Sequence, residues 1–129
     1  MKARVILAKP LALLYNLEQN AAILVILANL NIETKTIAPQ DLSQSVGFLA
    51  GLGGQRHAPF IDIAPETQMM LMANFSDQLL DTVLAALREQ GITTGFKAIV
   101  TPHNQAWTVE DLLKELQREK EEIEKGRAR

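Results

Sequence analysis

The sequence predicts an α/β protein: a small four-stranded parallel sheet with helices on both faces, in the order β-α-β-α-β-α-β-α. Residues 11–16 and 68–74 are apolar on both alternating faces, which is typical of central strands that are covered on both sides. The connector from Pro39 to Thr67 spans 29 residues. A hairpin needs only about 2–5 residues, whereas a parallel crossover needs a dozen or more.

A ferredoxin-like α+β sandwich with an extra C-terminal helix is the alternative. In that fold the second and third strands form an antiparallel hairpin and the helices cover one face of the sheet. The other face would then be covered by the last helix or by a second subunit.

The first half of the chain supplies two strands and one helix. A helix is expected over residues 18–30, with Ile23, Ile26, Leu27 and Leu30 at helical spacing. Leu24 and Val25 add apolar surface on its other sides, so we expect a homodimer that buries part of this helix or of the last one. The strand over 32–38 is β-branched but polar, which places it at a sheet edge. The first strand should pair with the second and the third.

The second half begins with a short helix within residues 41–52 and an irregular loop over 53–66 that contains Gly53-Gly54. Ser76 caps a helix that Gly91 ends, and a strand follows over 96–101. Thr108 and Asp111 make a capping-box-like start for the last helix, and Trp107 with Leu112 fits a hydrophobic staple around that start.

The organisation predicted is a single domain over residues 1–129, with an N-terminal extension (1–10) and a charged helix end and tail (117–129). A net charge of −2 predicts no binding to nucleic acid. The absence of cysteine excludes disulfides and thiolate metal sites. No secretory or membrane-spanning segment is recognised, so we expect a cytoplasmic protein. Because no phosphate-binding glycine motif and no metal-ligand cluster is found, we expect no cofactor and no bound metal.

Uncharged polar side chains at the predicted strand ends are the candidate binding residues. In an open parallel sheet they would share the carboxyl edge, where ligands bind. The alternative is local: Asn16 and Asn74 cap turns, Asn104 makes an Asx-turn and Trp107 anchors the last helix. The binding residues predicted are Asn16, Gln44, Gly47, Thr101, His103 and Asn104, with Trp107 as a structural anchor.

Four stretches together resemble one bacterial family, the domain of unknown function 3783. They are 13–17, 44–51, 70–77 and 97–107, and the Thr-Pro-x-Asn-x-x-Trp element from Thr101 to Trp107 is the most specific. The positions that match the motif of the family are Asn16, Gln44, Gly47, Thr101, Asn104 and Trp107. The chain departs from the family over 1–10 and 55–65. The resemblance implies a small bacterial intracellular protein and no particular activity.

The function predicted is a non-enzymatic binding or regulatory module for a small polar molecule or a protein partner. No nucleophile elbow, phosphate-binding glycine loop or metal-binding histidine motif is present. One alternative is a structural homodimer. The other is a small phosphate-handling or transferase-type enzyme that uses His103 as its acid or base.

Overall fold

The computed structural model describes residues 9–57 and 66–127, which gather into two units. The sheet unit comprises residues 1–36 and 68–99, and the helical unit comprises residues 37–67 and 100–129. Most of the predicted extension (1–10), the 58–65 part of the predicted loop and the last two residues of the tail lie outside the described residues. The single-domain organisation stays a prediction.

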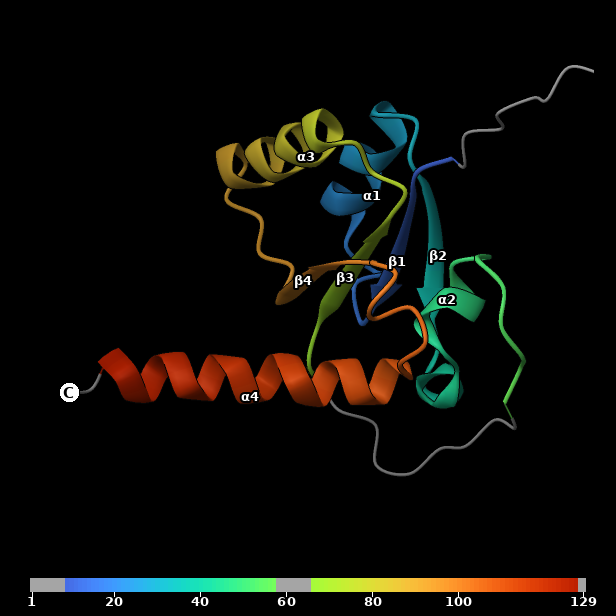
Figure 1. The fold of residues 1–129 in the computed structure, drawn as a ribbon. Coiled ribbons are helices and arrows are strands. Elements are labelled where there is room, and N and C mark those ends of the chain that lie inside the picture. Colours follow the sequence, from blue (N-terminus) through green and yellow to red (C-terminus); the bar gives the residue numbers. More distant parts are fainter. Residues whose placement is uncertain (1–8, 58–65, 128–129) are drawn as a thin grey trace, which may run out of the picture. The chain divides into compact units, whose positions relative to one another are not determined.

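Four strands form one sheet among the described residues, in the order β2-β1-β3-β4. Their bounds are β1 Leu11–Tyr15, β2 Glu33–Ile37, β3 Met69–Ala73 and β4 Phe96–Ile99. β1 and β3 are antiparallel with Leu13 opposite Leu71, and β3 and β4 are parallel with Leu71 opposite Ala98. β2 lies beside β1 and points in the same direction (Figure 1). The central position of β1 and the edge position of β2 are therefore confirmed.

The prediction of a purely parallel sheet is wrong, because β1 and β3 run in opposite directions. As a result β2 ends, and β3 begins, at the same end of the sheet. The two ends of the connector, after β2 and before β3, therefore meet the sheet at the same end. The length of the connector permits a parallel crossover without requiring one. The ferredoxin-like alternative fails too, since β2 and β3 are not neighbours.

Both helices of the sheet unit, α1 (Ala21–Asn29) and α3 (Asp77–Glu89), lie on one face of the sheet and contact each other (Figure 1). Crossovers between parallel strands are almost always right-handed. The antiparallel β1–β3 pair relates the two βαβ motifs by half a turn about the normal to the sheet. Equal handedness then puts both helices on the same face. The prediction that helices divide between the two faces does not hold for α1 and α3.

The core beneath these helices takes alternate residues from β1 and β3 together with the inward faces of α1 and α3. It consists of Ala12, Leu14, Leu17, Ile23, Ile26, Leu27, Ile32, Met70, Met72, Val83 and Leu87. Every residue of β3 is buried, including those that face away from this core. The prediction that β3 is a buried central strand is confirmed.

Side-chain caps fix where the helices begin. Asn20 Oδ1 accepts from the Ile23 amide at 3.2 Å, and Ser76 Oγ accepts from the Leu79 amide at 3.0 Å. The predicted cap of α3 is thereby confirmed, whereas α1 begins three residues later than predicted. Gly91 follows α3 with a φ of 65°, a left-handed conformation that glycine adopts without steric cost.

The helical unit contains a 3₁₀ helix, η1 (Pro39–Ser43), the short α2 (Val46–Leu49) and the long α4 (Val109–Arg127). The single short helix predicted within residues 41–52 is therefore two elements. Thr108 Oγ1 accepts from the Asp111 amide at 3.1 Å, which confirms Thr108 as the cap of α4. α4 continues through the predicted charged helix end and into the predicted tail, up to Arg127. None of the described helices has the length and apolar character that a membrane span requires.

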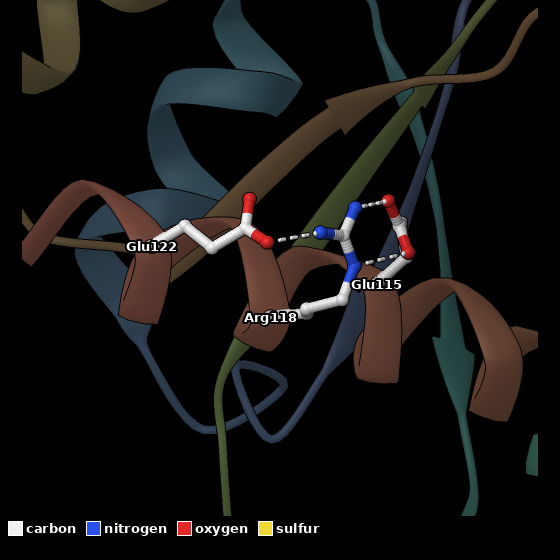
Figure 2. Close-up of polar contacts among 3 residues, drawn as sticks. All are labelled: Glu115, Arg118 and Glu122. Atoms are coloured by element: carbon white, nitrogen blue, oxygen red, sulfur yellow. Dashed lines mark hydrogen bonds and ion pairs between the residues drawn. The ribbon is translucent and has the colours of Figure 1, made fainter. Parts of the chain in front are cut away.

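An ion-pair cluster occupies the exposed part of α4 (Figure 2). Arg118 Nε donates to Glu115 Oε2 at 3.0 Å and Nη1 donates to Glu122 Oε1 at 2.7 Å, while Nη2 donates to Glu115 Oε1. The hydrogen bonds from Arg118 hold the pKa of the Glu115 carboxyl below its ordinary value. A carboxyl group whose pKa is lowered by folding stabilises the folded state at pH values above its pKa in the unfolded chain. This stabilisation is lost as the pH falls through the pKa of the folded state.

Replacing Arg118 by Gln removes these donors, so the pKa of Glu115 is expected to rise to the ordinary value for a glutamate. A carbon-detected NMR titration of the side-chain carboxyls measures this change. Lys125→Gln removes the same charge from the same helix and is expected to leave the pKa of Glu115 in place. An unchanged Glu115 pKa in Arg118→Gln would contradict the conclusion that Arg118 lowers it.

Candidate functional site

The segment from Thr101 to Trp107 forms a closed turn in the helical unit. The Thr101 amide donates to Asn104 Oδ1 at 2.8 Å, and the Asn104 amide donates back to Thr101 Oγ1 at 3.1 Å. The Trp107 amide donates to the Asn104 carbonyl at 3.0 Å. Each side chain thus satisfies the backbone of the other, as expected of asparagine and threonine turns. This geometry favours the turn-capping role for Asn104. Its binding role stays a prediction.

Backbone hydrogen bonds tie this turn to the start of α2. The Val46 amide donates to the Trp107 carbonyl at 2.8 Å, and the Gly47 amide donates to the Gln105 carbonyl at 2.7 Å. The close approach at Gly47 depends on the missing side chain. A Cβ atom at this position would lie 2.9 Å from the Gln105 carbonyl oxygen and 3.2 Å from the Gln105 Cβ. Gly47 is therefore needed for backbone contact.

Gln44 is a buried amide that positions the loop after α2. Its Nε2 donates to the His57 carbonyl at 2.7 Å, and its Oε1 accepts from the His57 amide at 2.8 Å. With these two hydrogen bonds, the side-chain amide of Gln44 takes the place of a peptide group of a neighbouring strand. With 2% of its surface exposed, Gln44 would be costly to bury without these partners. Its amide is committed to the backbone, so any effect on a ligand is indirect, through the position of His57.

A cavity of about 270 Å³ opens beside α2 within the helical unit. Two walls meet there: the loop after α2, which Gln44 holds at His57, and the turn that contacts Gly47. The residues that line the cavity are Ser45, Gly47, Leu52, Gly53, Gly54, Gln55, His57, Gln105 and Ala106. Its volume is close to the lower end of the range for small-molecule sites, about 300–1,000 Å³.

Left-handed glycines shape the loop wall of the cavity. Gly53 and Gly54 have φ values of 105° and 99°, which side chains with a Cβ rarely adopt. On the helix side, Ser45 Oγ accepts from the Phe48 amide at 3.2 Å and so caps α2. The Ser45 hydroxyl proton stays available as a donor, because the cap uses only its oxygen.

His103 lies outside the cavity lining. It is exposed, and its ring packs edge-on against Trp107 with ring centroids 5.3 Å apart. This contact does not provide a proton-transfer partner for the enzymatic alternative, whose acid or base would be His103. Within residues 9–57 and 66–127, no group of three or more His, Cys, Asp or Glu side chains is placed to hold a metal ion. Packing of Trp107 on Leu112 stays a prediction.

Asn16 belongs to the sheet unit, whereas the other five candidates belong to the helical unit. It follows β1 with a φ of 58°. Burial raises the pKa of the neighbouring Tyr15, and a hydrogen bond with the Asn16 side chain opposes this rise. Asn74, at the end of β3, lies at the opposite end of the sheet from Asn16, because β1 and β3 are antiparallel. The common carboxyl edge predicted for these two residues does not exist.

Of the residues that line the cavity, only Gly47 is among the binding residues predicted from the sequence. The Gly53-Gly54 pair and His57 are interpreted from sequence as a flexible turn and a solvated loop histidine. Their exposure agrees with that interpretation. The sequence signal that could have indicated the cavity is the pair of loop glycines shortly after a short helix that the buried polar residues Gln44 and Ser45 precede.

The fold and the cavity define this chain as a mixed α/β protein with a small polar cavity beside a glycine-rich loop. Residues 68–123 match the family model described as a domain of unknown function, number 3783, which identifies this segment as a member of that family. The match covers β3, α3, β4 and most of α4, and confirms the resemblance there. The resembling stretches 13–17 and 44–51 lie outside it. No curated protein and no solved structure matches the chain.

Gly47→Ala is expected to destabilise the protein by about 1–3 kcal/mol, because its methyl group must displace the Gln105 backbone. The higher helix propensity of alanine works in the opposite direction by about 1 kcal/mol. Gly126→Ala, in α4 with open space around the new methyl group, is the matched control and should preserve or raise stability. Urea unfolding of both variants measures the difference. Equal stabilities would contradict the close contact at Gly47.

Proposed function

We propose that this chain is a non-enzymatic binding module that takes a small polar molecule into the cavity beside α2. The observation that carries the proposal is the cavity itself, whose two walls are held by hydrogen bonds. Gln44 fixes the loop at His57, and Gly47 allows the Gln105 backbone to approach α2. A prearranged cavity with a few polar groups is the usual form of a small-molecule site.

The lining favours a neutral ligand. Of the described residues that line the cavity, none is an acid, a lysine or an arginine. Amide side chains at Gln55 and Gln105 offer both donors and acceptors, and the hydroxyl of Ser45 adds a donor. A flat or compact molecule with alternating donors and acceptors, such as a primary amide or a nucleobase, complements this set. A multiply charged phosphate ester would enter without a lysine or arginine in the lining to meet it.

The cytoplasm stays the predicted location and bacteria the predicted source. A regulatory role follows from the binding proposal if the ligand alters contacts with a protein partner. The acid–base alternative at His103 receives no support from its packing against Trp107, whereas the cavity supports binding directly.

Amide-resolved NMR titration of the full chain with neutral amides, nucleobases and simple sugars at millimolar concentration tests the proposal. One of these classes should shift the amide signals of Ser45, Gly53, Gly54 and Gln105 together, in a saturable manner. Ala106→Phe should abolish the shifts, because the ring fills the cavity from an exposed position. Lys97→Gln, outside the cavity lining, should leave them unchanged. The absence of a saturable response at these amides for all three classes would refute the proposal.

A further inference from the structure

The outer edge of β2 is the terminal edge of the sheet among the described residues. The side chains from Glu33 to Thr36 are exposed. The Glu33 amide donates to the Pro10 carbonyl at 3.3 Å, so the backbone groups of Glu33 point toward β1. Because these groups alternate along a strand, those of Thr34 and Thr36 point away from β1. Such an edge is a template for a further strand.

Charge selects one register for a second copy of the same strand. In an antiparallel pair centred on Thr34, each Glu33 lies opposite Lys35 of the other copy, which gives two Glu–Lys pairs. Thr34 would exchange both backbone hydrogen bonds with its counterpart, leaving the charged residues at the closely spaced non-hydrogen-bonded positions. A shift of the centre to Lys35 places lysine opposite lysine. Glu33 also lies 4.0 Å from Lys9 in its own chain, at the distance limit of an ion pair, so the proposed Glu33–Lys35 pairs compete with this contact.

An independent observation concerns α1, which contains no charged residue. Its outward face is apolar except for Asn29 at the C-terminal end: Val25 is 57% exposed, and Ala21, Ala22 and Ala28 are exposed too. α1 spans the crossover from β1 to β2 and therefore lies on the β2 side of the helix layer, with α3 over the other two strands (Figure 1).

The same antiparallel arrangement already exists inside the sheet unit. The β1–β3 pair brings α1 and α3 into contact on one face, with one helix for every two strands. Two strands span about 10 Å, which matches the spacing of about 8–10 Å between packed helices. If a second copy of the chain paired with β2 in this way, its α1 would lie beside the α1 of the first copy on the same face of the sheet. Each α1 would then cover apolar surface of the other.

We propose that two copies of this chain associate through their β2 edges, antiparallel and centred on Thr34, with the two α1 helices side by side. The sheet then continues across the dimer. The occupant is a second copy because one strand supplies both complementary charges and because the two-fold axis brings together two uncharged helices. The proposal is independent of the ligand cavity in the helical unit.

Charge exchange at β2 tests the proposed register. Sedimentation equilibrium of the full chain should show a reversible dimer. Glu33→Lys alone or Lys35→Glu alone should weaken it by about ten- to hundredfold, because two attractive pairs become repulsive. The double variant E33K/K35E should restore the dimer, and so should an equimolar mixture of the two single variants. Lys97→Glu, on the opposite edge strand β4, should have no effect.

Each remaining outcome overturns the proposal. A wild-type chain that stays monomeric at millimolar concentration has no such interface. A dimer that is insensitive to both single variants associates elsewhere, including through α1 alone. Failure of the double variant to recover while circular dichroism shows it folded would exclude the Thr34-centred register, because a register centred on Lys35 keeps like charges opposed after the exchange.

Disulfide trapping gives a second measurement, since the chain contains no cysteine. In the proposed register the Thr34 Cα atoms of the two copies are about 5.5 Å apart, which lies within disulfide range. Thr34→Cys should therefore form a covalent dimer on mild oxidation. Thr36→Cys is the matched control and should not, because each Thr36 faces Ile32 of the other copy. Equal trapping of both variants would contradict the register.

Discussion

Hydrogen bonds between β1 and β3 join the two βαβ motifs of the sheet unit, and their antiparallel direction determines where the other elements lie. Leu11 pairs with Ala73 at one end and Tyr15 with Met69 at the other. Since each crossover takes the same hand, this pairing places α1 and α3 on one face. It also leaves β2 and β4 as the two edges. Parallel pairing of the same two strands would have moved one helix to the other face.

In the helical unit, a close contact between two backbone segments determines where the other elements lie. Gly47 and Gln105 approach so closely that only glycine fits at position 47, and Gln44 secures the loop at His57. Polar residues that a functional interpretation would treat as ligand-binding groups instead satisfy the backbone: Gln44 binds a peptide group, and Thr101 and Asn104 bind each other. The cavity is a consequence of that framework and is lined mainly by their neighbours.

Local signals in the sequence predict the elements well, because caps and periodicity act over a few residues. Ser76 and Thr108 begin their helices as expected, and the polar β2 lies at an edge. Strand direction depends on where the connector after β2 returns, which no residue within the strands encodes. The error carries over to the site, since Asn16 and Asn74 share an edge only in a parallel sheet. The cavity depends on contacts between segments 44–57 and 105–106, beyond the reach of local patterns.

The direction and register of the β1–β3 pair can be measured by nuclear Overhauser spectroscopy of the full chain in D₂O. The account predicts strong Hα–Hα contacts at alternate pairs of the observed register, either at Leu13 with Leu71 or at both Ala12 with Met72 and Leu14 with Met70. The partner number in β3 must fall as the residue number rises along β1. Contacts in which both numbers rise together would show a parallel pair and contradict the account.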